Sequence, residues 1–170
     1  GRVFLDKSIE SVYANLGILY AGEFYMNLDI KTPAERIRNI LQLVEPALII
    51  STERQIKPIV GIIPETVQVI LLDTEDWTAE VEAGEIIARL STIIDTDPSC
   101  IINTSGSTGT PKGVVLNHKS FFDFIDWAID TFHFGDDLVM GSLSPIVFDI
   151  YSFELCMLMA KASTLVVLPA

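Results

Sequence analysis

Short apolar runs alternate with segments of helical periodicity along this chain, and this alternation constrains its fold more than any other feature. A short apolar run between turn signals is typical of a strand buried on both faces. Such runs occupy 47–51, 59–63, 67–72, 100–103, 113–116, 138–143 and 164–168. Segments with apolar residues three and four positions apart occupy 8–22, 32–45, 119–132 and 148–160. The pattern predicts an α/β fold with a largely parallel sheet covered by helices.

Helix start and stop signals mark the first two helical segments. Ser8 is a candidate N-cap for the first helix, and Gly22 is its stop signal. In the second segment Thr32 is predicted to cap the helix, with Pro33 at the first helical position and Glu35 completing a capping box.

Composition and charge restrict the classes of partner. The chain has 170 residues, of which 49% are hydrophobic, enough for a core of domain size. Its net charge of −12 disfavours nucleic acid and anionic membrane surfaces, so an anionic ligand needs a local binding device. The acidic stretch 73–88 is predicted to be a solvated loop with a short helix. Cys100 and Cys156 lie in apolar sequence without metal-ligand spacing, which indicates two buried, reduced thiols in a cytoplasmic protein.

A polar, glycine-rich stretch interrupts the apolar sequence between Asn103 and His118, which reads NTSGSTGTPKGVVLNH. Glycines let main-chain N–H groups approach a ligand, hydroxyls donate hydrogen bonds and a lysine supplies positive charge, so this composition suits phosphate. The spacing is not that of a P-loop, because Pro111 precedes Lys112 and Gly113 follows it. Composition alone leaves open a second interpretation, in which the stretch is a solvated hairpin loop between two strands.

The string TSGSTGTPKGVVLNH resembles the signature loop of the adenylate-forming enzymes. These include acyl-CoA synthetases, luciferases and the amino-acid adenylation domains of nonribosomal peptide synthetases. Two weaker similarities surround the loop in family order. Residues 9–52 resemble the family segment before the loop, and 144–169 (SPIVFDIYSFELCMLMAKASTLVVLP) resemble the segment that builds the acyl-substrate pocket. The resemblance implies that the chain is part of the large N-terminal domain of an adenylation enzyme.

The loop's role in the family is to bind the β- and γ-phosphates of ATP while a carboxylate attacks the α-phosphorus. The residues that the resemblance assigns to phosphate binding are Thr104, Ser105, Gly106, Ser107, Thr108, Gly109 and Lys112. It also implies Mg²⁺ bound with the nucleotide, no metal ligand from this chain, and a carrier protein or domain whose phosphopantetheine accepts the product. A loop that closes and reopens is expected to be weakly ordered between Ser105 and Lys112 without nucleotide.

An FD pair begins a helix at the substrate pocket in the amino-acid-activating branch of this family. The pair falls on Phe148 and Asp149, and the resemblance implies that Asp149 pairs with the substrate α-ammonium while Phe148 lies near its carboxylate. Ile150 and Phe153 fall on positions that select the substrate side chain. The alternative interpretation of Asp149 is a helix cap. Tyr151 stands where the family commonly has Ser, so it could reshape the pocket.

Several residues near these motifs have local interpretations. His118 follows the loop in the family as well and is predicted to start the next helix rather than to act as a general base. Phe122 and Ile125 are predicted on the apolar face of that helix, 119–132. Trp77 and Trp127 are interpreted as packing residues.

The resemblance further implies that the chain is a piece of a longer enzyme. In the family the adenine-binding segment, the ribose-binding Asp, the hinge and the C-terminal small domain with its catalytic Lys follow the matched region. We therefore expect residues 1–170 alone not to form an adenylate. The chain has no initiator Met, no signal-peptide pattern and no apolar run near the roughly eighteen residues that span a bilayer.

Three functions stay open at this stage. The first is ATP-dependent activation of an amino acid as its adenylate with release of pyrophosphate, in a peptide synthetase or a protein similar to D-alanine–carrier protein ligase. The second is a fatty or aryl acid–CoA ligase, which Asp149 disfavours because a carboxylate beside an uncharged acyl chain loses hydration without compensation. The third is a non-catalytic phosphate-binding module.

Overall fold

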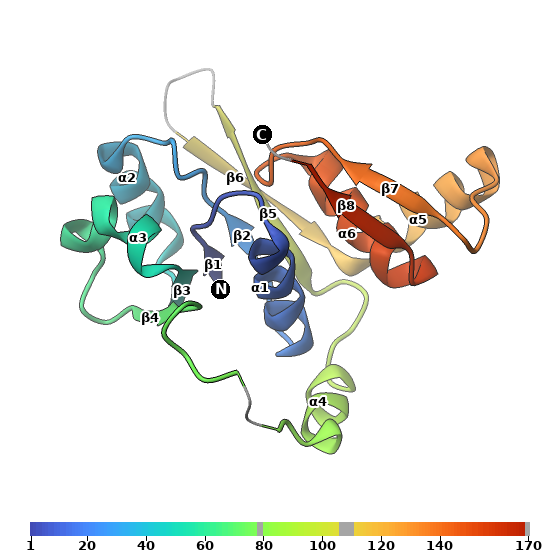
Figure 1. Ribbon diagram of the computed structural model, residues 1–170, viewed down its shortest axis with the longest axis horizontal. Helices are drawn as coiled ribbons and strands as arrows, with labels where there is room; N and C mark the ends of the chain where they lie inside the picture. The colour runs from blue at the N-terminus through green and yellow to red at the C-terminus, as the bar shows by residue number, and fades with distance from the viewer. Residues whose placement is uncertain (78–79, 106–110, 169–170) are drawn as a thin grey trace.

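The computed structural model describes residues 1–77, 80–105 and 111–168, and Figure 1 shows how its elements are arranged. The helices are α1 (Ile9–Tyr20), α2 (Ala34–Val44), α3 (Glu53–Ile56), the 3-10 helix η1 (Lys57–Ile62), α4 (Ala83–Leu90), α5 (His118–Phe132) and α6 (Asp149–Lys161). The strands are β1 (Arg2–Val3), β2 (Met26–Asn27), β3 (Leu48–Ser51), β4 (Gln68–Leu71), β5 (Pro98–Ser105), β6 (Pro111–Asn117), β7 (Val139–Ser142) and β8 (Thr164–Val167).

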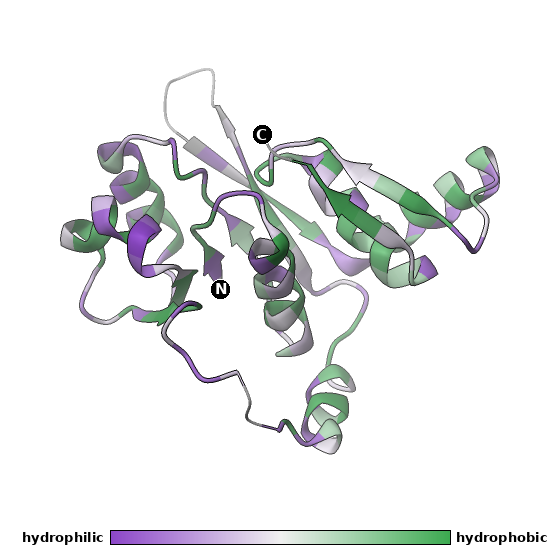
Figure 2. Cartoon of the chain, in the orientation of Figure 1, coloured by the Kyte–Doolittle hydropathy of each residue, from purple (hydrophilic) through white to green (hydrophobic). Residues whose placement is uncertain are grey.

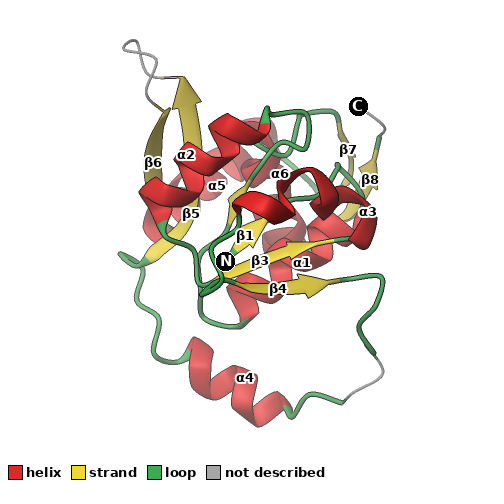
Figure 3. Cartoon of the chain, turned by 90° about the vertical axis from the view of Figure 1, so that its left-hand side faces the viewer, coloured by secondary structure: helices red, strands yellow, loops and turns green. Residues whose placement is uncertain are grey.

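A four-stranded parallel sheet in the order β2-β1-β3-β4 carries helices on both faces. Because successive side chains of a strand point to opposite faces, Phe4 and Ile49 join a core with α2, whereas Val3 and Ile50 join a core with α1. Figure 3 shows β1, β3 and β4 side by side with these helices around them. The predicted α/β class with largely parallel strands covered by helices is confirmed.

Two smaller strand pairs complete the structure. The hairpin of β5 and β6 is antiparallel, and it joins the main sheet through Tyr25, whose main-chain oxygen accepts a 2.9 Å hydrogen bond from the N–H of Ile101. β7 and β8 form a parallel pair connected through α6, and α5 packs beside α6 (Figure 1). The hairpin contacts the main sheet next to β2, and the turn before α6 contacts β2 itself, because Nδ2 of Asn27 donates to the main-chain oxygen of Ile146.

The predicted helix signals have different outcomes at the first two helices. Ser8 caps α1 as predicted, with a capping box in which Ser8 and Ser11 exchange hydrogen bonds. The predicted cap at Thr32 is wrong, because α2 follows Pro33 at the N-cap position without a side-chain cap. Thr32 belongs instead to a turn in which its N–H donates to the main-chain oxygen of Asp29. Local turn chemistry at Asp29 therefore overrides the capping-box pattern.

The apolar run 59–63 was predicted to be a strand, and this prediction is wrong. It lies mainly in η1, where Pro58 occupies an early helical position and Ile59 is 1% exposed in the α2-side core. A short apolar run buries equally well as a helical turn, and periodicity cannot separate the two. In Figure 2, α3 is mostly hydrophilic, whereas the strand β3 that precedes it is mostly hydrophobic.

Three aromatic residues lie differently from their sequence interpretation. Phe121 is 8% exposed and packs in the core, whereas Phe122, predicted on that face of α5, is 59% exposed. Trp77 and Trp127 are 62% and 52% exposed, so neither belongs to the buried core. Trp127 instead stacks on Phe124 with ring centroids 5.5 Å apart. Ile125 is buried on this face as predicted, so the helical period was read correctly and Phe122 is the residue assigned to the wrong face.

Candidate nucleotide and substrate site

The phosphate-binding candidates lie at the end of the β5–β6 hairpin. Thr104 pairs with Lys112 across the hairpin, and its hydroxyl donates a 3.5 Å hydrogen bond to the Lys112 main-chain oxygen. Both side chains are exposed. Gly113, opposite Asn103, leaves room for the neighbouring strand, because a Cβ there would lie 2.9 Å from Cγ2 of Ile101.

The tip of the hairpin lies outside the described residues. The tip contains four of the seven phosphate-binding candidates and the side chain of a fifth. The prediction of weak order in the loop falls on these residues as well. They are Gly106, Ser107, Thr108, Gly109 and, for its side chain only, Ser105. The antiparallel pairing on either side of the tip brings the described candidates Thr104 and Lys112 together.

The base of the hairpin passes directly into α5. Asn117 caps the helix by accepting a 2.9 Å hydrogen bond from the N–H of Ser120. His118 is the first residue of α5, as predicted, and its N–H donates to the main-chain oxygen of Asp97. Burial lowers the pKa of the His118 imidazole, with a smaller opposing effect of Asp97. The geometry gives His118 a structural part at the start of the helix.

The predicted substrate residues gather around the start of α6. Phe148 occupies the N-cap position without a side-chain cap, is 54% exposed, and its N–H donates to the main-chain oxygen of Pro145. Asp149 is the first helical residue, and its Oδ1 accepts a 2.9 Å hydrogen bond from the N–H of Ile150. Asp149 is exposed, so most of its hydrogen-bonding capacity remains available to a ligand. It is therefore a first-turn acid rather than the N-cap that the alternative interpretation required.

A pocket of about 260 Å³ opens between α5 and α6. Three of the four predicted substrate residues line it, namely Asp149, Ile150 and Phe153, whereas Phe148 does not. The rest of its lining comes from Leu116, Ser120, Phe121 and Phe124. Phe124 and Phe153 meet edge to face with ring centroids 5.3 Å apart. The chemical character is that of an apolar pocket with one carboxylate at its edge.

The contribution of α5 to this pocket was missed in the sequence. The only sequence signal for this part of α5 was the helical spacing of apolar residues after the hairpin. Such spacing shows that a helix has a buried face, but it does not show what that face contacts. Tyr151, expected to reshape the pocket, is fully buried and points elsewhere, since its hydroxyl accepts a 3.3 Å hydrogen bond from Asn15 on α1. The pocket is formed by Phe153 and its α5 neighbours instead.

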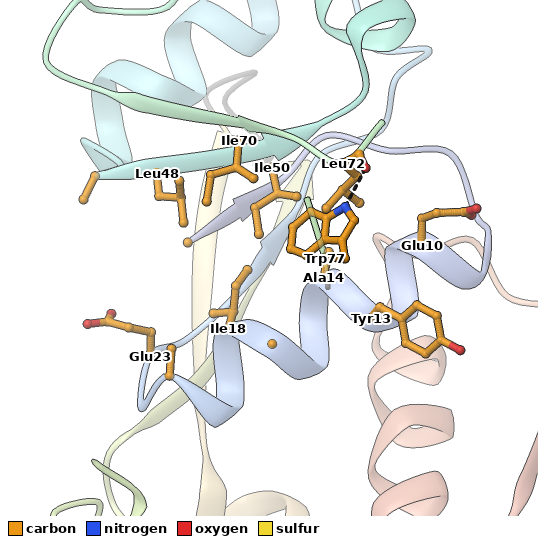
Figure 4. Close-up of a pocket in the computed structure, with 14 residues that line it drawn as sticks. Glu10, Tyr13, Ala14, Ile18, Glu23, Leu48, Ile50, Ile70, Leu72 and Trp77 are labelled. Carbon is orange, nitrogen blue, oxygen red and sulfur yellow. Dashed lines mark hydrogen bonds between the residues drawn. The ribbon is translucent and has the colours of Figure 1, made fainter. Parts of the chain in front are cut away.

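An apolar groove of about 770 Å³ lies apart from these residues, between α1 and the strands β3 and β4 (Figure 4). Its labelled walls are mostly hydrocarbon, with Ile50 and Ile70 from the sheet and Ile18 from α1. Trp77 closes one side, and its indole N–H donates a 2.8 Å hydrogen bond to the Leu72 main-chain oxygen. Such a surface has few donors for phosphate, so it is not a nucleotide site.

A more polar cavity of about 590 Å³ lies at the carboxyl ends of β1, β3 and β4, where parallel sheets often bind ligands. Two of its polar side chains, those of Asp73 and Lys7, already bond neighbouring segments. Both carboxylate oxygens of Asp73 accept from the N–H of Glu53, and Nζ of Lys7 donates to the main-chain oxygen of Ser142. These bonds leave the hairpin and the α6 pocket as the better candidate site.

Comparison with known proteins decides the family. The model of the AMP-binding enzyme family matches residues 2–170. This chain belongs to that family. The adenylate-forming resemblance read from the hairpin loop is thereby confirmed over almost the whole length of this AMP-binding chain.

Curated relatives of this AMP-binding chain are peptide synthetases. The dimodular nonribosomal peptide synthase of Bacillus subtilis (strain 168) is 33% identical over 169 residues, covering 96% of this chain and 7% of the relative. Tyrocidine synthase 1 of Brevibacillus parabrevis is 30% identical over 166 residues, covering 98% of this chain and 15% of the relative. The chain therefore spans only a small part of the curated relatives that it matches.

Solved structures show the same fold. The crystal structure of the nonribosomal peptide synthetase FmoA3 matches with a TM-score of 0.82 at 26% identity, covering 99% of this chain and 17% of that chain. The structure of McyG A-PCP complexed with phenylalanyl-adenylate matches with a TM-score of 0.82 at 20% identity, covering 99% and 28%. The second likeness concerns the fold alone.

Two properties of the described part of this AMP-binding chain bear on its ligands. None of its described helices combines the length and apolar character needed to cross a bilayer. Within the same residues, no three His, Cys, Asp or Glu side chains gather closely enough to hold a metal ion. The described hairpin offers a hydroxyl and an ammonium group, which can donate hydrogen bonds to an anion.

Proposed function

We propose that the protein containing this chain activates an amino acid with ATP, forming an aminoacyl-adenylate and releasing pyrophosphate. The observation that carries the proposal is the pocket between α5 and α6. Among the described residues that line it, Asp149 is the one charged group, and the others are apolar except Ser120. A carboxylate at the edge of an apolar pocket matches an amino acid, whose α-ammonium needs a counter-charge and whose side chain needs an apolar surface.

The hairpin supplies the nucleotide half of the proposed site. Thr104 and Lys112 lie on neighbouring strands beside the tip, where a hydroxyl and an ammonium can bind phosphate oxygens of ATP. The other proposed phosphate ligands are Ser105, Gly106, Ser107, Thr108 and Gly109. Charge stabilisation of this kind is the main contribution a protein makes to transfer at phosphorus. Mg²⁺ would be held largely by the phosphates, because the described donors suit an anion.

The substrate half places each proposed residue in a role. Asp149 would bind the α-ammonium, Phe148 would lie near the substrate carboxylate, and Ile150 and Phe153 would contact the substrate side chain. Support comes from the curated relatives, which are peptide synthetases. We extend the proposal to a carrier protein or domain whose phosphopantetheine thiol accepts the aminoacyl group. The chain would then be part of a larger N-terminal domain, and residues 1–170 alone would not be catalytically competent.

The proposal is tested by amino-acid-dependent exchange of radiolabelled pyrophosphate into ATP, measured on the full-length protein with a panel of amino acids, fatty acids and aryl acids. We expect exchange with one or a few amino acids. Asp149→Asn keeps the side-chain shape but removes the charge, and it should lower kcat/KM for the amino acid about a hundredfold, as loss of one partner from a desolvated ion pair does. Asp123→Asn is the control, since Asp123 is an exposed acid on α5 whose contact is a surface ion pair with Lys119.

Each other result of this assay contradicts the proposal in a defined way. Exchange that depends on a fatty or aryl acid and survives Asp149→Asn would identify an acyl–CoA ligase. Nucleotide binding without exchange for any acid would identify a phosphate-binding module. Robust exchange by residues 1–170 alone would contradict the proposed need for the rest of the enzyme.

A further inference from the structure

We infer that Asn27 is a positioning residue for the substrate pocket and acts through the main chain of the loop that leads into α6. Asn27 lies on β2 and is 6% exposed, and its Nδ2 donates a 2.8 Å hydrogen bond to the main-chain oxygen of Ile146. The inference rests on the proposed function, because its consequence is the placement of Asp149 in the proposed amino-acid site.

The hydrogen bond reaches the middle of the turn that sets the direction of α6. The N–H of Phe148 donates to the main-chain oxygen of Pro145 at 3.1 Å, which closes the turn directly before Asp149. Ile146 sits inside this turn with its side chain 6% exposed in the core. Asn27 therefore fixes the main-chain oxygen of Ile146, while packing in the core fixes the Ile146 side chain. These two contacts hold the turn in place directly before α6 begins.

Tyr25, the residue directly before β2, contacts α6 at a second point. Residues two apart in an extended segment point to one side, and the hydroxyl of Tyr25 donates a 2.9 Å hydrogen bond to Oγ of Ser152, in the first turn of α6. The main chain of Tyr25 also bonds β5, at Ser99 and Ile101. The extended segment 25–27 thus joins the phosphate hairpin and the substrate helix, and Asn27 is its contact with the entry to that helix.

The amide orientation of Asn27 follows from the same geometry. Its Oδ1 is buried without a hydrogen-bond partner, so the side chain gains its one bond only when Nδ2 faces Ile146. Turning the amide over would place two acceptors against each other and lose that bond. Asn27→Leu keeps the approximate size of the side chain and removes the donor without adding an ionisable group, which makes it the sharpest test of this contact.

The test uses the full-length protein with Asn27→Ala and Asn27→Leu. The control is Ser51→Ala, which removes another buried donor to a main-chain oxygen, the 2.6 Å bond to Phe4 within the four-stranded sheet. We expect both Asn27 variants to raise KM for the amino acid in the pyrophosphate-exchange assay about tenfold, the size of one lost buried hydrogen bond, and to leave KM for ATP unchanged. Ser51→Ala should change the two constants equally or not at all.

A second measurement separates this inference from the proposed function. Hydrogen–deuterium exchange of 143–150 should accelerate in both Asn27 variants relative to wild type and to Ser51→Ala. Unchanged exchange of this segment, or an equal rise of both KM values, would overturn the positioning role. If the wild type activates no amino acid, the proposed function fails, and the exchange of 143–150 still decides whether Asn27 holds the turn.

Discussion

The buried side chain of Asn15 on α1 depends on one hydrogen bond to Tyr151 on α6. Asn15 is fully buried on α1, and its Nδ2 donates to the hydroxyl of Tyr151, while its Oδ1 has no partner. Burial raises the pKa of the Tyr151 phenol, so it stays neutral at physiological pH. The Tyr151 hydroxyl therefore accepts the hydrogen bond of the Asn15 amide, which would otherwise have no partner. The family commonly has the smaller Ser at the position of Tyr151.

Tyr151→Phe should lower the free energy of unfolding by about 1–3 kcal/mol, because it leaves the buried Nδ2 of Asn15 without an acceptor. Tyr13→Phe is the matched control and should change stability by less than about 0.5 kcal/mol, since Tyr13 is 68% exposed on the same helix as Asn15. Urea unfolding followed by circular dichroism measures both. Equal stabilities of the two variants would show that the Asn15–Tyr151 bond contributes nothing.

The hairpin of β5 and β6 is the element that carries the proposed phosphate site, and its strands pair closely at one point. Asn103 faces Gly113, and the side chain of Ile101 lies against that glycine. The positions before the tip must pair in register for Thr104 and Lys112 to face the same ligand. A glycine in this strand is explained by close approach of the neighbouring side chain.

Gly113→Ala should destabilise the protein by about 1–3 kcal/mol, because the new methyl group would lie 2.9 Å from Cγ2 of the β-branched Ile101. Gly17→Ala is the control within α1, where a Cβ would meet no heavy atom within 4 Å, and it should stabilise by up to about 1 kcal/mol. Combining Gly113→Ala with Ile101→Ala should recover part of the loss in urea unfolding. Strict additivity of the two changes would contradict the proposed clash.

The molecule as a whole is held together where the sheet, the hairpin and α6 meet. Cys100 on β5 is fully buried there, and its Sγ lies 3.8 Å from Oγ of Ser152. Cys156, on the same helix as Ser152, is half-buried, and both thiols are free in this structure. The predicted full burial therefore holds for Cys100 and not for Cys156. Burial, with a smaller effect of Cys100, raises the pKa of Cys156 to about 12.

The two thiols should report global unfolding. In the folded protein at pH 8 they stay protonated and should react slowly with Ellman's reagent, whereas the unfolded thiols, with a pKa of about 8.5, should react readily. Because the folded state holds these protons more tightly, stability should fall as pH rises from about 8.5 towards 12. The urea midpoint of labelling should match that of circular dichroism, and rapid labelling of Cys156 in native buffer would refute the prediction.

How much the sequence could predict depends on how local each feature is. The cap at Ser8, the start of α5 at His118 and the strands on either side of the glycine loop follow from neighbouring residues. β1 and β2 escaped prediction because each has two residues, too few for a period. The Thr32 cap and the strand at 59–63 failed where a turn and a core contact outweighed local preference.

The α/β class, the family and the residues of the proposed phosphate loop follow from the amino-acid sequence alone, because each depends on local patterns along the chain. Three features required the folded structure: Phe124 of α5 lines the proposed substrate pocket, Tyr151 turns into the core, and Asn27 bonds the turn before α6. The reason is separation along the chain: Asn27 and Ile146 lie 119 residues apart. A contact of that range has no local pattern and exists only once the sheet and the helices have packed.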